Sequence, residues 1–207
     1  MKNEERSELT REKILQAALH EFGEHGYEGG TIGHICKTGI NKGLIYHHFK
    51  SKDDLYLTCM RYAVNHLLLE VGDLDLQGQN IQDVISTYMN KRYVFFKTYH
   101  DEARIVFEGL LSVPTKLTSE VQEIFAPLHD LNEKLYQALL NSITLKENVN
   151  KEAALSYFSM VQSMFNAYFS SPMMRQESLE TRIEEHEKRI PQFLDFMLYG
   201  VAKKEGE

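Results

Sequence analysis

The segment NKGLIYHHFKSKDDL (residues 41–55) organises the N-terminal part of this chain and carries its most unusual charge pattern. It predicts a helix of about eight residues, roughly 12 Å long. A longer helix follows, for which Ser51 and Asp54 form a capping-box pattern. Just upstream, TIGHICK (residues 31–37) predicts another short helix, with Thr31 as its N-cap. Two short helices separated by a few residues have the spacing of a helix-turn-helix.

Charge is distributed unevenly along the 207 residues, whose formal net charge is −7. The stretch 29–52 contains no acidic residue and four lysines: Lys37, Lys42, Lys50 and Lys52. Residues 1–52 contain eight basic and seven acidic residues, which gives +1 and leaves −8 for residues 53–207. A local positive stripe on an acidic chain indicates a surface that meets a polyanion such as DNA.

The rest of the chain is also predicted to be helical, so the expected fold class is all-α. A first helix has Thr10 as its N-cap and ends near Gly23 and Gly26. The polar segment 72–80 separates the long helix after Ser51 from the later ones. Those later helices are expected at about 81–99, 102–111, 118–145 (interrupted at Pro127), 150–170 and 178–200 (interrupted at Pro191).

Composition narrows the class of protein. With 43% hydrophobic and 26% charged residues, the chain is predicted to be globular rather than disordered. No apolar run reaches the ~20 residues of a membrane span, and the charged N-terminus does not read as a signal peptide. Cys36 and Cys59 form no disulfide framework. We therefore expect a cytoplasmic protein with no membrane partner.

The segment 31–55, with REKILQAALHEFGEHGY before it, resembles the DNA-binding part of the TetR family of bacterial transcriptional regulators. The resemblance covers about the first 60 residues and rests on the order Lys-Gly-x-x-Tyr-x-x-Phe-Lys-x-Lys from Lys42 to Lys52. One departure is a turn before Gly39 that reads one residue shorter than in the family. The resemblance implies a three-helix DNA-binding domain at 1–52 and a larger helical domain at 53–207 that dimerises and binds a ligand.

The expected DNA-binding residues are Thr31, Lys42, Gly43, Tyr46, His47 and Lys50. The lysines supply charge to phosphates, and Gly43 permits close approach of the backbone. Tyr46 and Thr31 supply hydroxyl groups, and His47 can contact a base edge or a phosphate. Leu44, Ile45 and Phe49 are expected to hold this short helix against the apolar core.

The resemblance also places a ligand pocket and a dimer interface in the later helices. The pocket residues expected are Tyr93, Phe96, Phe107, Tyr136, Met164 and Tyr168, which suit a hydrophobic or aromatic small molecule. Aromatic residues at helical spacing equally suit an ordinary core. The dimer residues expected are Phe158, Val161, Phe165, Phe193, Phe196 and Met197, from the last two helices.

The resemblance therefore implies a homodimeric, ligand-responsive repressor that binds a pseudo-palindromic double-stranded operator and is released by a small-molecule effector. An enzyme is disfavoured because no catalytic trio, metal-ligand spacing or phosphate-binding loop is visible, so no cofactor or metal is expected. A helical protein-interaction module with a degenerate helix-turn-helix is the alternative. The segment EEHEKR (residues 184–189) is interpreted as a solvated helix face, and His20, His25 and His34 as surface or boundary residues.

Overall fold

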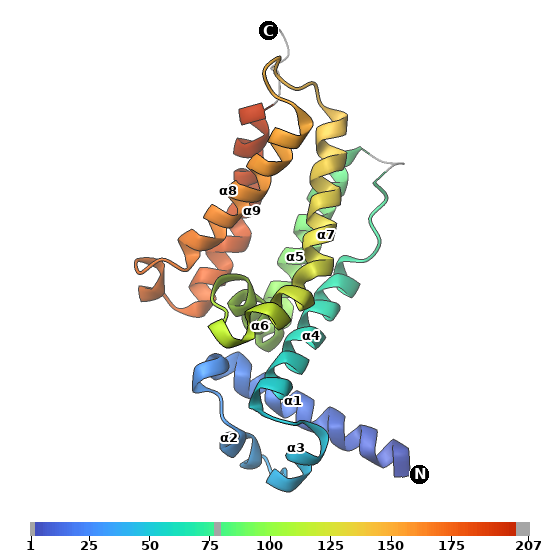
Figure 1. Ribbon diagram of the computed structural model, residues 1–207, viewed down its shortest axis with the longest axis vertical. Coiled ribbons are helices and arrows are strands. Elements are labelled where there is room, and N and C mark those ends of the chain that lie inside the picture. Colours follow the sequence, from blue (N-terminus) through green and yellow to red (C-terminus); the bar gives the residue numbers. More distant parts are fainter. Residues whose placement is uncertain (1–2, 77–79, 202–207) are drawn as a thin grey trace. The chain divides into compact units, whose positions relative to one another are not determined.

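The computed structural model describes residues 3–76 and 80–201, which form helices and contain no strand (Figure 1). The all-α prediction is therefore confirmed. Within these ranges, none of the helices combines the length and the apolar composition that a membrane span requires. The predicted boundary segment 72–80 lies partly outside the described residues, because 77–79 are not among them.

The helices pack as two compact units. One contains the described residues up to His66 together with Lys97–Ile124, and the other contains Leu67–Phe96 together with the described residues from Phe125 onward. This grouping describes packing between helices. The functional division at residue 52 stays a prediction.

The first unit contains α1 (Asn3–Gly29), α2 (Ile32–Cys36), α3 (Lys42–His48), the start of α4 (Lys52–Val71), α6 (His100–Leu111), η1 (Thr115–Leu117) and the start of α7 (Thr118–Ser142). Helix α1 packs along α6 and also contacts α2 and α3. The core of this first unit consists of side chains that are almost fully buried, including Ile14, Ala18, Phe22, Ile35, Ile45, Phe49, Leu55 and Ile105. Because α2 and α3 are too short to be stable alone, this apolar packing is what maintains them.

Helix α1 differs from the prediction at its start. It begins at Asn3, so the prediction that Thr10 is an N-cap is wrong. The Thr10 hydroxyl donates to the carbonyl of Arg6, 2.8 Å away, and is thus satisfied inside the helix. Near the expected end, Gly26 has φ 64° and breaks the helical geometry, and helical residues continue beyond this kink to Gly29.

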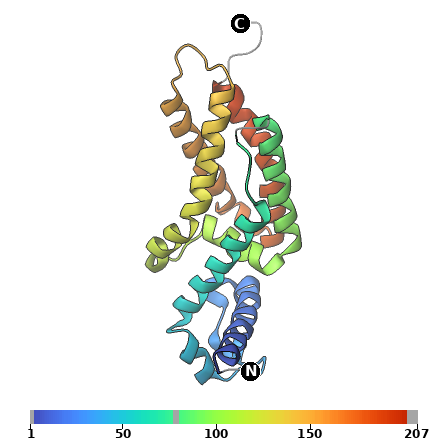
Figure 2. The same cartoon turned by 90° about the vertical axis from the view of Figure 1, so that its right-hand side faces the viewer.

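The second unit contains the rest of α4, most of α5 (Ile81–Thr98), the rest of α7, α8 (Lys151–Phe169), η2 (Met174–Gln176) and α9 (Leu179–Val201). Helices α8 and α9 lie side by side, and Figure 2 shows α9 beside α5 as well. The predicted interruptions at Pro127 and Pro191 are wrong, since α7 and α9 continue through them. Buried neighbours such as Ile124 and Leu128 anchor α7 on both sides of Pro127, so packing outweighs the missing N–H group.

Candidate functional site

Two capped short helices form the helix-turn-helix. Thr31 Oγ1 accepts a hydrogen bond from the backbone N–H of His34 at 3.1 Å, which confirms its role as the N-cap of α2. Asn41 Oδ1 accepts from the N–H of Gly43 at 2.7 Å and begins α3. Gly39 lies in the connecting turn with φ 91°, a backbone conformation that glycine adopts without strain. The sequence therefore encodes both helix starts and the turn between them.

The two buried residues of α3 and its C-cap show which face of the helix is exposed. Ile45 and Phe49 are 1% and 2% exposed. Because successive side chains rotate by ~100°, Gly43 and His47 point away from the core, with positions 44 and 46 on either flank. Leu44 is 45% exposed, so the expectation that it packs in the core is wrong. A seven-residue helix has room to bury one stripe, and Ile45 with Phe49 occupies it.

The six predicted DNA-binding residues all lie on the exposed surface of the segment 31–50. Lys42, Gly43, Tyr46 and His47 belong to α3, Thr31 precedes α2, and Lys50 follows α3. Tyr46 is 48% exposed, and Lys42 Nζ lies 6.0 Å from the centre of its ring. The structure thus gathers cationic, hydroxyl and imidazole groups on one short element.

The acidic residues that follow this segment are paired. Lys116 Nζ donates to Asp53 Oδ2 at 2.8 Å, and the Tyr27 hydroxyl donates to Asp53 Oδ1 at 2.6 Å. The hydrogen bond from Lys116, assisted by that from Tyr27, lowers the pKa of Asp53. The N–H of Asp54 donates to Ser51 Oγ, as the capping-box pattern predicts, while its carboxylate accepts from the N–H of Lys50 at 2.8 Å instead of from that of Ser51. Both carboxylates therefore stabilise the start of α4.

A cavity of about 1220 Å³ lies in the second unit. Its lining comes from α5, α9, the end of α7 and the residues after it: apolar Ile85, Met89, Leu139, Ile143, Leu194 and Leu198, with polar Ser86, Asn90, Glu187, Lys188 and Asp195 among others. Such a mixture of apolar walls and a few polar groups is typical of small-molecule sites.

The six predicted pocket residues are not gathered around this cavity, and of them Tyr93 alone belongs to its lining. Phe96 and Tyr136 are buried in the second unit, and Phe107 is fully buried in the first. Met164 and Tyr168 are 63% and 38% exposed on α8. The spacing of apolar residues along a helix did not distinguish residues that line a cavity from core or surface residues. The difference depends on which other helix, cavity or solvent each helix face contacts.

The six predicted dimer residues differ in how far they are exposed. Phe158 and Met197 are buried within the chain, so they are not available to a partner in this structure. Phe165 and Phe193 are half-buried and stack on each other with ring centres 4.4 Å apart. Val161 is half-buried, and Phe196 is 62% exposed. Three further apolar side chains on α8 are exposed, namely Met160, Met164 and Tyr168.

A buried polar network joins α5, α8 and α9. Arg92 donates two hydrogen bonds to Glu187, at 3.0 and 2.7 Å, and both side chains are buried. His186 Nδ1 lies 3.0 Å from Glu187 Oε1, and its Nε2 lies 3.0 Å from Asn166 Oδ1. The interpretation of 184–189 as a solvated face is therefore wrong for its two central residues. One turn of α9 is polar inside because buried Arg92 on another helix supplies the matching charge.

The pKa values of Glu187 and His186 are both lower than the ordinary values of these groups. Burial by itself would raise the pKa of Glu187, but the charge of Arg92 and the contacts with His186 together outweigh burial and lower it. Burial lowers the pKa of His186, against the opposing hydrogen bond with Glu187. Glu187 is therefore ionised and His186 neutral near pH 7, which leaves one compensated charge pair inside the helices.

Known proteins are similar to the N-terminal helices and, more weakly, to the whole chain. Residues 14–59 match the model of a family described as bacterial regulatory proteins, tetR family. The uncharacterized HTH-type transcriptional regulator YerO of Bacillus subtilis is 24% identical over 197 residues, which cover 93% of this chain and 66% of that relative, just under two thirds. IcaR of Staphylococcus epidermidis, a negative transcriptional regulator of the biofilm operon icaADBC, is 27% identical, with 68% of this chain and 76% of IcaR covered.

The fold also matches solved structures. FadR from Bacillus subtilis, a transcriptional regulator solved in complex with stearoyl-CoA, has a TM-score of 0.61 and 17% identity. The match covers 86% of this chain and 95% of that one, so the likeness extends over the N-terminal helices and the later bundle alike.

Proposed function

We propose that this chain, whose residues 14–59 match the tetR family of bacterial regulatory proteins, represses transcription by binding a pseudo-palindromic operator as a homodimer. The observation that carries this proposal is the exposed face of α3, which presents Lys42, Tyr46 and His47 within an acid-free stretch. Its place of action is the cytoplasm, where bacterial DNA lies.

On the operator, α3 enters the major groove with Gly43 and His47 toward the bases. Lys42 and Lys50 neutralise phosphates, and their charge gives binding its dependence on salt. The Thr31 hydroxyl accepts from the His34 N–H, and its hydrogen is available to donate to a phosphate oxygen. Exposed Leu44 joins this surface and suits the methyl group of thymine.

Dimerisation uses the exposed apolar surface of α8 and α9, formed by Met160, Met164, Tyr168 and Phe196. A two-fold axis through this surface makes it self-complementary and presents two copies of α3. Two reading helices about 34–36 Å apart match one turn of DNA, which accounts for an operator with inverted symmetry.

The effector occupies the 1220 Å³ cavity of the second unit. Its walls suit a molecule with a hydrophobic or aromatic body, and Lys188 with Asn90 suits a polar or anionic group on that body. The fold neighbour FadR, which binds stearoyl-CoA, supports a ligand of this kind. Release from DNA follows if the effector prefers the conformation that binds the operator poorly, because only differential affinity shifts the equilibrium.

The experiment that tests this function is recovery of fragmented genomic DNA by the purified protein at about 150 mM salt, where weak phosphate contacts are screened. We expect a few fragments that share an inverted repeat. The matched control is Lys42→Ala/Tyr46→Ala, which removes two exposed α3 side chains and leaves buried Ile45 in place. It should lose the enrichment. Uniform recovery by both proteins would mean that α3 does not read sequence.

A further inference from the structure

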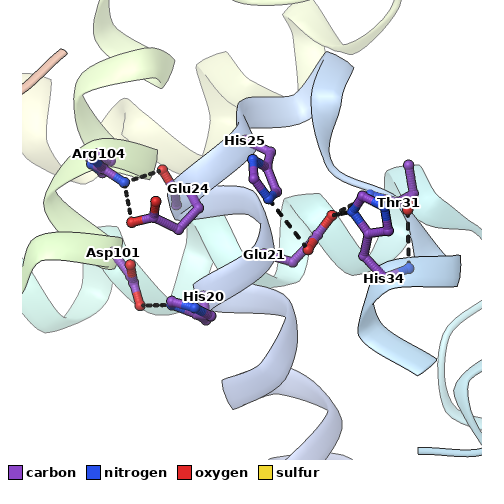
Figure 3. A network of polar contacts seen from close by, with 9 residues as sticks. His20, Glu21, Glu24, His25, Thr31, His34, Asp101 and Arg104 are labelled. Atoms are coloured by element: carbon purple, nitrogen blue, oxygen red, sulfur yellow. Dashed lines mark hydrogen bonds and ion pairs between the residues drawn. The ribbon is translucent and has the colours of Figure 1, made fainter. Parts of the chain in front are cut away.

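Three side chains with metal-binding atoms meet where α1 faces α2 (Figure 3). Glu21 and His25 lie one turn apart on α1, and His34 lies on α2. His34 Nδ1 is 3.0 Å from Glu21 Oε1, and His25 Nε2 is 4.0 Å from Glu21 Oε2. One ligand atom from each of the three residues lies within 4.8 Å of the other two. The proposed function uses none of these groups.

We propose that Glu21, His25 and His34 bind one divalent transition-metal ion, with Zn²⁺ the best match. Two imidazoles and one carboxylate are a ligand set that zinc uses in proteins when a further position is left for water. Tetrahedral zinc with bonds of about 2.0–2.1 Å holds its ligand atoms about 3.3 Å apart. The separation of His34 Nδ1 from Glu21 Oε1, 3.0 Å, is slightly below that value, and that of His25 Nε2 from Glu21 Oε2, 4.0 Å, is above it. Small side-chain adjustments are therefore enough to accept the ion.

Burial differs among the three ligands in the way that such a site requires. Glu21 is 8% exposed, so its charge is held largely out of water and needs a compensating positive group. The side chains of His25 and His34 are 50% and 46% exposed, which gives an ion access from solvent and room for bound water. A cation at this position compensates the Glu21 charge more completely than a neutral imidazole does.

A backbone hydrogen bond orients the Glu21 carboxylate. The N–H of Thr31 donates to Glu21 Oε1 at 2.9 Å, which is the kind of supporting hydrogen bond that fixes a metal-binding carboxylate. The left-handed conformation of Gly26 kinks α1 just after His25 and redirects the chain, and His34 meets Glu21 thirteen residues away in sequence. An ion here ties the N-terminus of α2 to α1.

Coordination replaces the proton shared between His34 Nδ1 and Glu21. The ion accepts electron pairs from His34 Nδ1, His25 Nε2 and one Glu21 oxygen, and the proton on His34 Nδ1 moves to Nε2, so that His34 binds as a neutral imidazole.

The test is titration of the tag-free, full-length protein with Zn²⁺ in competition with a chromophoric chelator, without DNA. We expect one high-affinity Zn²⁺ per chain. His25→Gln and His34→Gln should each weaken binding at least about tenfold, because removing a ligand costs no less than removing a supporting contact. Glu21→Gln should weaken it as well, while its amide oxygen still accepts from Thr31.

The matched control is His20→Gln, which removes another exposed α1 histidine that pairs with Asp101 at 3.0 Å (Figure 3). It should bind Zn²⁺ like the unaltered chain. Circular dichroism of each variant checks that the helices are retained, as the exposure of both histidines leads us to expect. Absence of binding to the unaltered protein, or equal binding by His25→Gln/His34→Gln, would overturn the proposal. Since no DNA is present, this result is independent of the operator experiment.

Discussion

At the scale of single residues, burial assigns the roles on α3. Leu44, Ile45 and Phe49 are equally apolar in the sequence, yet Leu44 is 45% exposed and the other two are almost fully buried. A helix of seven residues packs one side against its neighbours, and the ~100° step between residues rotates Leu44 away from it. An exposed leucine beside Tyr46 and His47 thus becomes part of the proposed DNA-reading surface.

Lys50→Ala should weaken binding to all DNA sequences alike. Its side chain is exposed at the end of α3, while its backbone N–H is held by Asp54. Loss of one phosphate contact should reduce the slope of log K against log salt by about 0.9. The measurement is fluorescence anisotropy on operator and random duplexes over a range of salt. Lys134→Ala, an exposed lysine on α7, is the control and should keep the slope. An unchanged slope for Lys50→Ala would remove it from the phosphate contacts.

At the scale of elements, two glycines permit close packing of α1 on α6. A Cβ at Gly23 would lie 2.7 Å from the backbone Cα of Asp101, and a Cβ at Gly26 would collide with the Glu108 carboxylate. Around this close approach, Arg104 donates to the carbonyl of Gly23 and pairs with Glu24 (Figure 3). The spacing between the two helices therefore depends on the absence of side chains as much as on polar contacts.

Gly23→Ala should lower the free energy of unfolding by ~1–3 kcal/mol, the usual cost of overpacking. The reason is that backbone atoms, rather than the end of a flexible side chain, meet the added methyl group. Chemical denaturation monitored by circular dichroism measures it. Gly33→Ala on α2 is the control, because its Cβ would come no closer than 3.8 Å to Thr31 Oγ1. Equal stability of the two variants would contradict the close packing of α1 on α6.

The Arg92–Glu187 pair between α5 and α9 should show strong coupling. Arg92→Leu leaves the Glu187 charge buried without its partner, which costs ~3–5 kcal/mol. The double variant Arg92→Leu/Glu187→Leu removes both charges and should recover much of that loss. A double-mutant cycle of unfolding free energies measures the coupling. Additive effects of the two substitutions would show that the ion pair does not stabilise this contact.

At the scale of the whole molecule, α8 and α9 expose the apolar side chains that we propose as the dimer seam. We expect Phe196→Glu to shift the protein from dimer to monomer, because a charge at the proposed seam must be desolvated. Sedimentation equilibrium measures the shift. Leu69→Glu is the matched control, since Leu69 is 78% exposed on α4, and it should leave the dimer intact. If both variants stay dimeric, the seam lies elsewhere.

Stability should decrease as the pH falls through the usual pKa of histidine. His186 has a folded-state pKa lowered by burial, so below about pH 6.5 the unfolded chain binds a proton that the folded chain does not. Its contribution is complete above that pH and is lost as pH falls toward the folded-state pKa. His186→Gln should lose less unfolding free energy than the unaltered protein between about pH 7.5 and 5.5. Identical losses would exclude His186 from the pH dependence.

The sequence alone predicted the features that depend on short-range interactions. The helical class, the caps at Thr31 and Ser51, the turn around Gly39 and the exposed basic character of α3 all depend on neighbours within a few residues.

Long-range packing settled the remainder. Contacts between helices distant in sequence decide which apolar residues line the cavity and which stay exposed. They also bury His186 and Glu187 against Arg92 and bring Glu21 to His34. The physical reason is that helical periodicity gives the direction of a side chain from its own axis. What that side chain meets depends on which helix, which solvent-facing space or which second molecule lies there.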